Sequence, residues 1–568
     1  MTFERQILLA LFVAIVPFVS TGHERSQQVP SKKELMNKLL TLNDALVETQ
    51  MQRQLTTGDR YAGAVLDADS VVSPIQTSHF IQTLMCSYVS PRSRYYRSPE
   101  LLKRMTLAAH ALVELQHEDG TIDLVTTNFH STPDLGFTIF PLAVSYSIMR
   151  QNKELSFGDL TDPMKKYLLK AGDALSVGGI HTPNHRWVVS AALAWLHSFF
   201  EEPKYKARID QWLAEKVDID PDGQYHERST AIYTPVTNLA LLDIARKVGY
   251  TQLYDVVRKN LDMTLYFVHA NGEIVTESSR RQDKYLRNDM SKYFNAYNQL
   301  ALLDNDGRYA AMVEYIMTNV PTAHLLYMLP LFIENPAQLK DLPPAAKLPV
   351  RYHKHFKHSD MVRIREEEVD MSIITDNSTF FTFFKGTAAL EGMRLSSAFF
   401  GKGQFISQKL EKDGDTYILT STMEGPYYQP LPKEKLPTDG HGWSIPRTER
   451  KQSEVQTLFT KVSITPQGAS AVIRVEVQGP ENLPVALELG FRSGGTLQNV
   501  TPKNGLANAF LSRNGAKVVY RNGTDTITVG PGRVAHKWVQ LRGALPKLDA
   551  DCVFLTAYAP CTFEFTIQ

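Results

Sequence analysis

The period of the apolar residues changes near the middle of the chain, and this change constrains the fold more than any other feature. Up to Asn335 the apolar residues recur at helical spacing, as in Leu101–Gln116 and Asn184–Phe200, which is typical of amphipathic helices. Beyond residue 350, apolar and polar residues alternate in short runs that end at glycine-containing turns, which indicates antiparallel strands. The chain therefore predicts a helical part followed by a β-sheet part.

Short glycine-containing turns divide the helical part into repeats. They fall at Asp119-Gly120, Gly178-Gly179, Asp222-Gly223 and Asn271-Gly272, with spacings of 59, 44 and 49 residues. A period of roughly 50 residues fits one helical hairpin per repeat. We expect a ring of helical hairpins in which the polar segments after the turns open on the same end.

A proline-rich stretch, residues 336–350, separates the two parts. We predict a helical domain over residues 31–335, a linker over residues 336–350 and a β-domain over residues 351–568, built as an antiparallel sandwich. With 568 residues, the chain is long enough to form two or more large cores.

Residues 1–22 predict a secretory signal peptide. Arg5 precedes a continuous apolar run from Ile7 to Val19, and small residues follow at positions 20–22. A charged start, a short apolar stretch and small residues form the pattern of a cleaved export signal. We therefore expect a secreted or periplasmic protein.

Composition argues against several classes of protein and of site. Lysines and arginines number 61 against 60 aspartates and glutamates, and 43% of the residues are hydrophobic. This balance fits neither a nucleic-acid-binding protein nor a disordered chain. Cys86, Cys552 and Cys561 are too few for a disulfide framework or a four-cysteine zinc site. Cys552 and Cys561 are either bridged or two buried thiols.

The sequence favours chemistry without a metal. The helical part contains no repeated Asp-x-Asp loop and no His-x-x-His helix. The histidines His353, His355 and His358 fit a polar surface better than a transition-metal site. We expect no metal and no other cofactor.

Four polar segments, one after each turn, hold the candidate site residues. They are Asn128 and His130 in the first segment; His181, Asn184, His185 and Arg186 in the second; Tyr225, His226 and Tyr233 in the third; and Arg280 and Arg281 in the fourth. A ring of hairpins would bring the four segments to one pocket, which favours a functional site over four unrelated loops. Taken singly, each also has a structural interpretation: Asn184, for example, is a residue type that caps helices.

The residue types suit acid–base chemistry beside a carboxylate. His226 and Tyr233 can both take up and release protons. The amide of Asn184 donates hydrogen bonds, and the forked donors of Arg280 and Arg281 match a carboxylate. The segments therefore favour a pocket that holds a carboxylate next to an acid–base pair.

Together the segments resemble the α/α-toroid polysaccharide lyases, the group that contains chondroitin AC lyases, hyaluronate lyases and heparinase II-like enzymes. Asn128 with Asp134-Leu135-Gly136 resembles the family's Asn-Trp-Trp motif, and Pro183–Arg186 resembles its Gly-Ala-Asn-Arg motif. His226 and Tyr233 resemble the His and Tyr that follow an Asp-Gly-Ser-Phe turn in the family. Arg280 and Arg281 resemble its arginine-bearing turn. Phe129 and His130 replace the two tryptophans, which favours a pocket that acts on chain ends. The resemblance implies an N-terminal (α/α) toroid of helical hairpins followed by a C-terminal antiparallel β-sandwich.

The resemblance also implies a reaction. A lyase of this kind removes the C5 proton of a uronic acid such as glucuronate and expels the O4 substituent, leaving a 4,5-unsaturated sugar. Asn184 and His185, with one of the two arginines, would neutralise the carboxylate by positive or donor character. Tyr233 would act as base and then as acid with His226 holding it, or His226 would be the base and Tyr233 the acid. The implied catalytic residues are Tyr233, His226, Asn184, His185 and Arg280, and the implied substrate-binding residues are Asn128, His130, His181, Arg186, Arg281 and Tyr225.

The expected partner is a uronic-acid-containing glycan, and two other functions compete with the lyase. A glycoside hydrolase on the same ring would need two carboxylates across the scissile bond, for which Asp119, Asp222, Glu227 and Glu277 are available. A non-catalytic glycan-binding protein would keep the arginines and aromatic residues without the acid–base pair. For a lyase, the first choice of substrate is the L-rhamnose-α-1,4-D-glucuronate cap of arabinogalactan, with glycosaminoglycans or alginate as alternatives.

Overall fold

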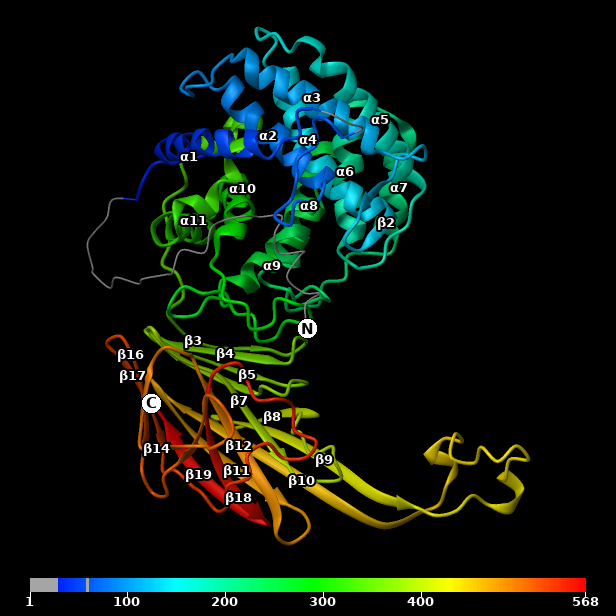
Figure 1. Cartoon of the computed structure of the whole chain (residues 1–568). Helices are drawn as coiled ribbons and strands as arrows, with labels where there is room; N and C mark the ends of the chain where they lie inside the picture. The colour runs from blue at the N-terminus through cyan, green and yellow to red at the C-terminus, as the bar shows by residue number, and fades with distance from the viewer. Residues whose placement is uncertain (1–28, 58–60) are drawn as a thin grey trace. The chain divides into compact units, whose positions relative to one another are not determined.

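The computed structural model describes residues 29–57 and 61–568, so the signal peptide expected over residues 1–22 lies outside the described part of the chain. The chain forms two compact units. The helical unit comprises the described residues up to Val268 together with Gly272–Leu348, and the β unit comprises His269–Asn271 and Pro349–Gln568 (Figure 1).

Helical hairpins arranged as a toroid make up the helical unit, as predicted. Its described α-helices are α1 (Lys32–Gln52), α2 (Pro74–Val89), α3 (Pro99–Leu115), α4 (Thr132–Gln151), α5 (Thr161–Val177), α6 (His185–Phe200), α7 (Pro203–Ala214), α8 (Tyr233–Val248), α9 (Leu253–Thr264), α10 (Phe294–Asp304), α11 (Gly307–Asn319) and α12 (Met328–Glu334). Each even-numbered helix from α2 to α10 packs on the odd-numbered helix that follows it, and α2, α4, α6, α8 and α10 pack side by side in that order. None of these described helices is long and apolar enough to cross a membrane.

Helices α4 and α6 run parallel, so their N-termini lie at one end of the unit. Near the starts of α4 and α6, the ring centroids of Phe137 and His185 are 5.9 Å apart. Near the ends of the same helices, the rings of Tyr146 and Phe199 are 5.1 Å apart. Matching contacts at both ends require the two helices to run in the same direction. The polar segments that precede these helices therefore share one end, as the repeat predicted.

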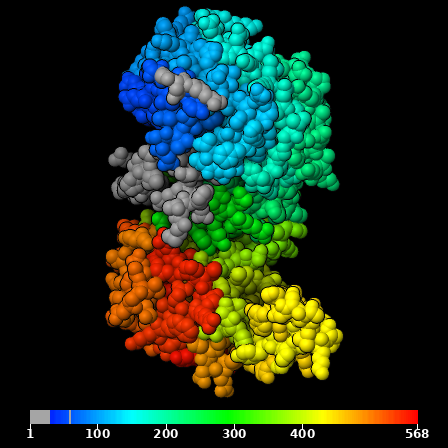
Figure 2. Space-filling model, turned by 45° about the vertical axis from the view of Figure 1, so that its right-hand side comes forward, coloured from blue at the N-terminus to red at the C-terminus, as the bar shows by residue number. Residues whose placement is uncertain are grey.

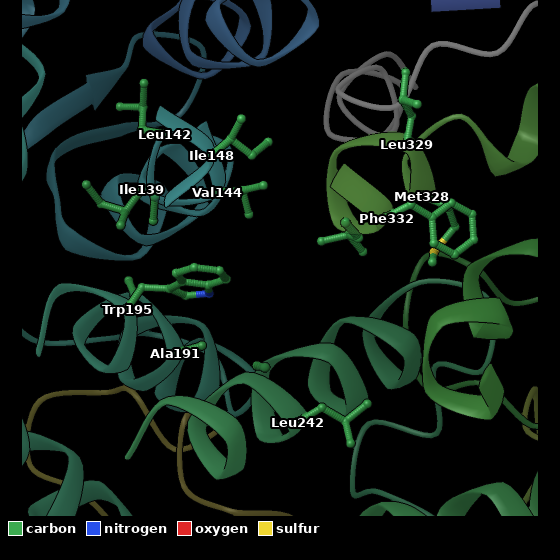
Figure 3. Close-up of a cluster of buried hydrophobic side chains, with 14 of the residues drawn as sticks. Ile139, Leu142, Val144, Ile148, Ala191, Trp195, Leu242, Met328, Leu329 and Phe332 are labelled. Carbon is green, nitrogen blue, oxygen red and sulfur yellow. The ribbon is translucent and has the colours of Figure 1, made fainter. Parts of the chain in front are cut away.

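Apolar side chains from the inner helices fill the middle of the helical unit. Figure 3 shows part of this cluster, to which α4 contributes Ile139 and Ile148, α6 contributes Trp195, α8 contributes Leu242 and α12 contributes Phe332. Trp195 is fully buried and its indole donates a 2.9 Å hydrogen bond to Asp243 of α8. Burying a large apolar side chain stabilises a fold by about 2 kcal/mol, so this core holds the helix starts in place.

Three of the four predicted glycine turns share one geometry. Gly120, Gly223 and Gly272 adopt positive φ, and a Cβ atom at Gly120 or Gly223 would lie 2.3 Å from a carbonyl oxygen of an outer helix. Only glycine permits this approach without a shift of the backbone. The turn at Gly178-Gly179 has a different geometry. There α5 ends in an extended conformation, and Arg208 of α7 donates to the Gly178 carbonyl at 2.6 Å.

Two sheets make up the β unit. The order of the eight-stranded sheet is β13-β16-β17-β19-β11-β10-β9-β8, and that of the nine-stranded sheet is β14-β15-β18-β12-β7-β6-β5-β4-β3. The strands are β3 (Arg351–Phe356), β4 (Met361–Glu366), β5 (Val369–Ile374), β6 (Phe381–Lys385), β7 (Ala388–Ser397), β8 (Lys409–Asp413), β9 (Thr416–Tyr428), β10 (Gln452–Gln467), β11 (Ser470–Gln478), β12 (Leu483–Phe491), β13 (Thr496–Gln498), β14 (Val500–Pro502), β15 (Ala509–Ser512), β16 (Val518–Asn522), β17 (Asp525–Gly530), β18 (Asp551–Ala559) and β19 (Cys561–Ile567). Pairing is antiparallel as predicted, apart from the parallel pair β15 and β18. One apolar cluster contains side chains from both sheets, so the sheets form a sandwich.

The cysteines of the β unit are separate thiols. Cys552 lies on β18 and Cys561 lies on β19, which belong to different sheets. Both are free, and burial raises the pKa of each thiol. The sequence left open whether Cys552 and Cys561 form a disulfide or are two separate thiols, and in the structure they are separate thiols.

Candidate active site

The candidate site forms where α6 and α8 begin. Asn184 is the residue immediately before α6, and Tyr233 is the first residue of α8. Both side chains are almost fully buried. The N-terminus of a helix carries a partial positive charge and unpaired N–H groups. Two parallel helix starts therefore give this end of the unit a preference for anions.

Glu227 connects the residues of the site. Asn184 donates from Nδ2 to Oε2 of Glu227 at 2.9 Å, and Nε of Arg281 lies 3.4 Å from Oε1 of the same carboxylate. Glu227 is only 8% exposed, and this burial raises its pKa although Asn184 and Arg281 pull the pKa down. One buried carboxylate thus holds an amide and a guanidinium from two different segments.

Tyr233 lies against the same arginine. The Arg281 guanidinium lies 5.2 Å from the centre of the Tyr233 ring, and Gln282 donates a hydrogen bond to the Tyr233 hydroxyl. Since the hydroxyl accepts this bond, its own proton is not used in it. The phenol is therefore oriented by protein groups while it keeps a proton to exchange.

Two buried polar atoms of this cluster lack a hydrogen-bond partner among the described residues and take part in no ion pair. They are Oδ1 of Asn184 and Nδ1 of His185, whereas Oε1 of Glu227 and Nε of Arg281 face each other in the ion pair. Buried polar atoms in proteins are nearly always hydrogen-bonded, and leaving one unpaired costs about 1–3 kcal/mol. A set of donors and acceptors left over at one place is what a site for a polar ligand requires.

His185 is a buried histidine with a lowered pKa. It is the first residue of α6 and is 9% exposed, and its ring meets the edge of His181 at a centroid distance of 4.8 Å. Burial, with smaller contributions from His181 and Arg281, lowers the pKa of His185 to about 3. This favours donor or acceptor character for His185 at neutral pH over a positive charge.

His226 and Arg280 are placed differently from their neighbours in sequence. The side chains of both are exposed, and no hydrogen bond joins His226 to Tyr233 in the described structure. The backbone N–H of Arg280 donates to the Glu227 carbonyl at 3.2 Å. It is Arg281 whose guanidinium lies at Glu227 and at the Tyr233 ring.

Two predicted substrate-binding residues have structural partners instead. Arg186 pairs with Asp218 at 2.8 Å and with Glu215 at 3.1 Å. Tyr225 is 5% exposed and belongs to the apolar core, where its hydroxyl donates to Asn238 at 2.9 Å. These contacts give both residues a structural role in the helical unit, and their assignment to substrate binding stays a prediction.

The first polar segment lies at the same end, before α4. β2 (Asn128–Ser131) pairs with β1 (Ile122–Leu124), and Asn128 donates to Asp134 at 2.8 Å. The exposed His130 pairs with Asp119 at 2.8 Å, and its ring stacks on His117 at 4.0 Å. Thr132 donates to the Gly179 carbonyl at 2.5 Å, which ties this segment to the one that holds Asn184.

Two residues of the cluster were not predicted as lyase residues. The sequence offers Glu227 only as a carboxylate for the hydrolase alternative, and it gives no reason to assign Gln282 to the site. Glu227 directly follows His226, so its position beside a candidate site residue is visible in the sequence. A polar run of sequence does not show, however, whether a carboxylate in it is buried or exposed. Gln282 directly follows Arg281 and had no signal of its own.

Metal binding finds no support in the described residues. Across residues 29–57 and 61–568, no three His, Cys, Asp or Glu side chains are grouped so that they could hold an ion. His353 and His355 lie on β3 and His358 follows that strand.

Several polysaccharide lyases are among the solved structures that resemble this chain. Chondroitin AC lyase of Streptomyces coelicolor A3, in complex with chondroitin sulphate, matches with a TM-score of 0.57 at 12% identity, over 100% of this chain and 82% of that chain. Heparinase III matches with a TM-score of 0.53 at 13% identity, over 97% and 86%. Paenibacillus xanthan lyase matches with a TM-score of 0.57 at 10% identity, over 94% of this chain and 57% of that chain.

The fold is that of the α/α-toroid polysaccharide lyases. At these identities the likeness concerns the architecture alone. No protein-family model matches the sequence, and no curated protein matches it.

Proposed function

We propose that this protein is a polysaccharide lyase that cleaves the bond to O4 of a uronic acid by β-elimination and leaves a 4,5-unsaturated uronate. The observation that supports this most is the buried cluster of Asn184, Glu227, Arg281 and Tyr233 at the starts of two parallel helices. It combines an anion-binding environment with a proton-exchanging group, in a chain with the lyase fold.

Carboxylate neutralisation is the first requirement of this reaction, because the C5 proton of a uronate is only weakly acidic. The second N–H of the Asn184 amide makes only a long bond of 3.5 Å to Oγ1 of Thr182, which a substrate carboxylate would replace, and Arg281 supplies positive charge. Together with the start of α6, these groups would stabilise the negative charge that develops on the carboxylate as the proton leaves. Glu227 would hold Asn184 and Arg281 in position.

Tyr233 would transfer the proton. In glucuronate the C5 hydrogen and the O4 leaving group lie on the same face of the ring, so one residue can serve both. The Tyr233 phenolate takes the C5 proton, the C4–O4 bond breaks as the C4=C5 double bond forms, and the phenol returns the proton to O4. The hydrogen bond from Gln282 can hold the oxygen in both protonation states. His226 is exposed, which favours Tyr233 over His226 as the base.

The substrate we propose first is the L-rhamnose-α-1,4-D-glucuronate cap of arabinogalactan, in a secreted or periplasmic setting. Phe129 and His130 stand where toroid lyases have two tryptophans, so a long polymer-gripping cleft is less favoured than a pocket for chain ends. The exposed ring of Phe129 could still pack on a sugar at the mouth of the site.

The raised pKa of Glu227 favours one competing function. A buried carboxylic acid with a raised pKa is what a glycoside hydrolase uses to protonate its leaving group. The two reactions leave different products. Incubation with arabinogalactan, chondroitin sulphate, alginate and xanthan should produce the ultraviolet absorbance of a C4=C5 unsaturated uronate with at least one glycan. New reducing ends without that absorbance would support the hydrolase, and neither signal would support a binding protein.

A further inference from the structure

Strands β9 and β10 continue past the rest of their sheet. β8 pairs with β9 only up to Thr420, and β11 pairs with β10 only from Phe459 onward. Beyond these points β9 and β10 pair only with each other, out to Tyr428 opposite Gln452. We call residues 422–458 the arm, and residues 429–451 its tip loop. Figure 1 shows the arm as a long ribbon that leaves the sheet (yellow), and Figure 2 shows its tip as a lobe at the edge of the β unit.

The tip loop presents an exposed tryptophan in a fixed orientation. Trp443 is 70% exposed, the most of any tryptophan described. The Arg450 guanidinium lies 4.8 Å from the centre of its ring and donates to the carbonyls of Gln429 and Gly442 at 3.3 and 2.9 Å. The arginine therefore supports one face of the indole and is itself held by the backbone. An aromatic ring held in this way is a preorganised contact surface.

The tip loop that carries this tryptophan has an excess of positive charge. The tip loop contains five basic residues, Lys433, Lys435, Arg447, Arg450 and Lys451, against three acidic ones, Glu434, Asp439 and Glu449. Lys435 pairs with Glu449, so the excess of positive charge comes from the other four basic residues. Arg447 lies 5.8 Å from the ring of Tyr428, a second pair of arginine and aromatic ring.

We infer that the tip of the arm is a second, non-catalytic site that binds an anionic polysaccharide. The exposed face of Trp443 would pack on the C–H face of a sugar ring, as an amphipathic aromatic surface does. Arg447 and the lysines would pair with carboxylate or sulfate groups on neighbouring sugars. The choice of an acidic glycan as ligand rests in part on the proposed function, whereas the site itself rests on the arm.

A second copy of this chain fits the arm less well. In a two-fold symmetric contact the same patch lies on both partners, and two positively charged tips would repel each other. The core of a protein interface is also depleted of charged residues, whereas the exposed apolar side chains of the tip, Leu436 and Trp443, stand among charged ones.

Affinity electrophoresis of the full chain tests this inference. The gels contain chondroitin sulphate, polygalacturonate or gum arabic, with neutral dextran as the control polymer, and all proteins carry Tyr233→Phe so that the polymer is not cut. Trp443→Ala should weaken binding of at least one acidic polymer about tenfold or more. Trp443→Phe, which keeps an aromatic face, should retain most of the binding.

Trp538→Ala is the matched control. Trp538 is 48% exposed and lies outside the arm, where its indole donates to the Gln540 carbonyl at 2.8 Å. The inference is overturned if Trp443→Ala binds like Trp538→Ala, or if no acidic polymer retards the parent protein. It is also overturned if light scattering shows that Trp443→Ala converts a dimer into a monomer. Tryptophan-dependent binding without any unsaturated product from the Tyr233-containing protein would refute the proposed function and leave the arm site standing.

Discussion

At the scale of single residues, one buried carboxylate organises the candidate site. Asn184 occupies the position of a helix cap, yet its side chain makes no capping bond and donates to Glu227 instead. Since Arg281 also lies at Glu227, the carboxylate sets the positions of both groups that would face a substrate carboxylate. In the proposed reaction Glu227 would therefore be a positioning residue, and Asn184, Arg281 and Tyr233 would be the residues that touch the substrate.

Removing the Tyr233 hydroxyl should abolish most of the activity without unfolding the protein. We expect Tyr233→Phe to lower turnover about 10²-fold or more, because it deletes the proton-exchanging group and keeps the ring. Tyr225→Phe is the control, since the Tyr225 hydroxyl bonds Asn238 in the core. It should cost about 1–3 kcal/mol of stability and leave turnover nearly unchanged. Initial rates and urea denaturation measure both effects, and an active Tyr233→Phe protein would contradict the mechanism.

Replacing Glu227 by glutamine should separate stability from activity. Burial raises the pKa of Glu227, so its neutral form is the one that favours folding. That stabilisation is complete below the unfolded pKa of about 4.3 and is lost as the pH rises through the higher folded pKa. Glu227→Gln should therefore be at least as stable as the parent at pH 7, and the difference should vanish near pH 4.

The same variant should lower turnover about tenfold, because glutamine can still accept from Asn184 but cannot pair with the charge of Arg281. Denaturation at pH 4 and pH 7, with rates at pH 7, measures the two effects. Unchanged turnover would remove Glu227 from the site. A dead Glu227→Gln protein beside an active Tyr233→Phe protein would support the hydrolase.

At the scale of elements, the turns between helices decide which polar segments reach the site. Gly223 begins the segment that leads to Glu227 and α8, and its φ of +104° allows close contact with α9. Asn260 of α9 donates to the Gly223 carbonyl at 2.8 Å. The turn is therefore fixed to an outer helix, and the residues that follow it start from a defined point.

A methyl group at Gly223 should destabilise the helical unit. Its Cβ would lie 2.3 Å from the Lys259 carbonyl oxygen, so the turn or α9 must shift. Gly223→Ala should lower the free energy of unfolding by at least about 2 kcal/mol and reduce activity with it. Gly179→Ala, where no atom lies within 4 Å of the added Cβ, should change stability by less than about 0.5 kcal/mol. Equal stabilities for the two variants would contradict this account of the turns.

At the scale of the whole molecule, each unit has its own core, and the β unit buries a charged group as well. Asp370 is fully buried. It accepts from His269 at 2.8 Å, pairs with Arg363 at 2.8 Å and accepts the Ala270 backbone N–H at 2.7 Å. His269 also stacks on Phe384 at 3.7 Å. These contacts make the three residues His269–Asn271 part of the β unit, although the residues before and after them in the chain belong to the helical unit.

Neutralising Asp370 should destabilise the β unit in a pH-dependent way. Burial by itself would raise the pKa of Asp370, but His269, Arg363 and the donated hydrogen bonds outweigh it and hold the pKa well below its usual range. A depressed pKa contributes stability that is present above the unfolded pKa of about 4 and is lost as the pH falls below it. Asp370→Asn should therefore cost about 3–5 kcal/mol at pH 7, and the difference from the parent should shrink below pH 4.

Urea denaturation at pH 7, 5 and 3 measures this effect, with Asp413→Asn as the control. Asp413 lies exposed at the end of β8, so its replacement should change stability by less than about 0.5 kcal/mol. If Asp370→Asn and Asp413→Asn are equally stable at pH 7, the buried ion pair does not stabilise the unit.

The fold class and the end of the helical unit that carries the site could be predicted from the sequence. Both depend on periodic patterns: apolar residues at helical or strand spacing set the element type, and the repeat of glycine turns sets the hairpin. Burial of the apolar faces is the dominant driving force of folding, so a regular apolar pattern is compatible with few folds. The prediction of polar segments gathered at one end, with Asn184 and Tyr233 among them, followed from the repeat alone.

Only the tertiary structure decided which side chain of each polar segment points into the site. His226 and Glu227 are neighbours, as are Arg280 and Arg281, yet in each pair the second residue lies in the cluster and the first is exposed. Consecutive side chains on a turning backbone point in different directions, and a local sequence does not say which direction faces a neighbouring helix. The raised pKa of Glu227 and the lowered pKa of His185 both result from burial, and this burial is produced by elements far away in the chain.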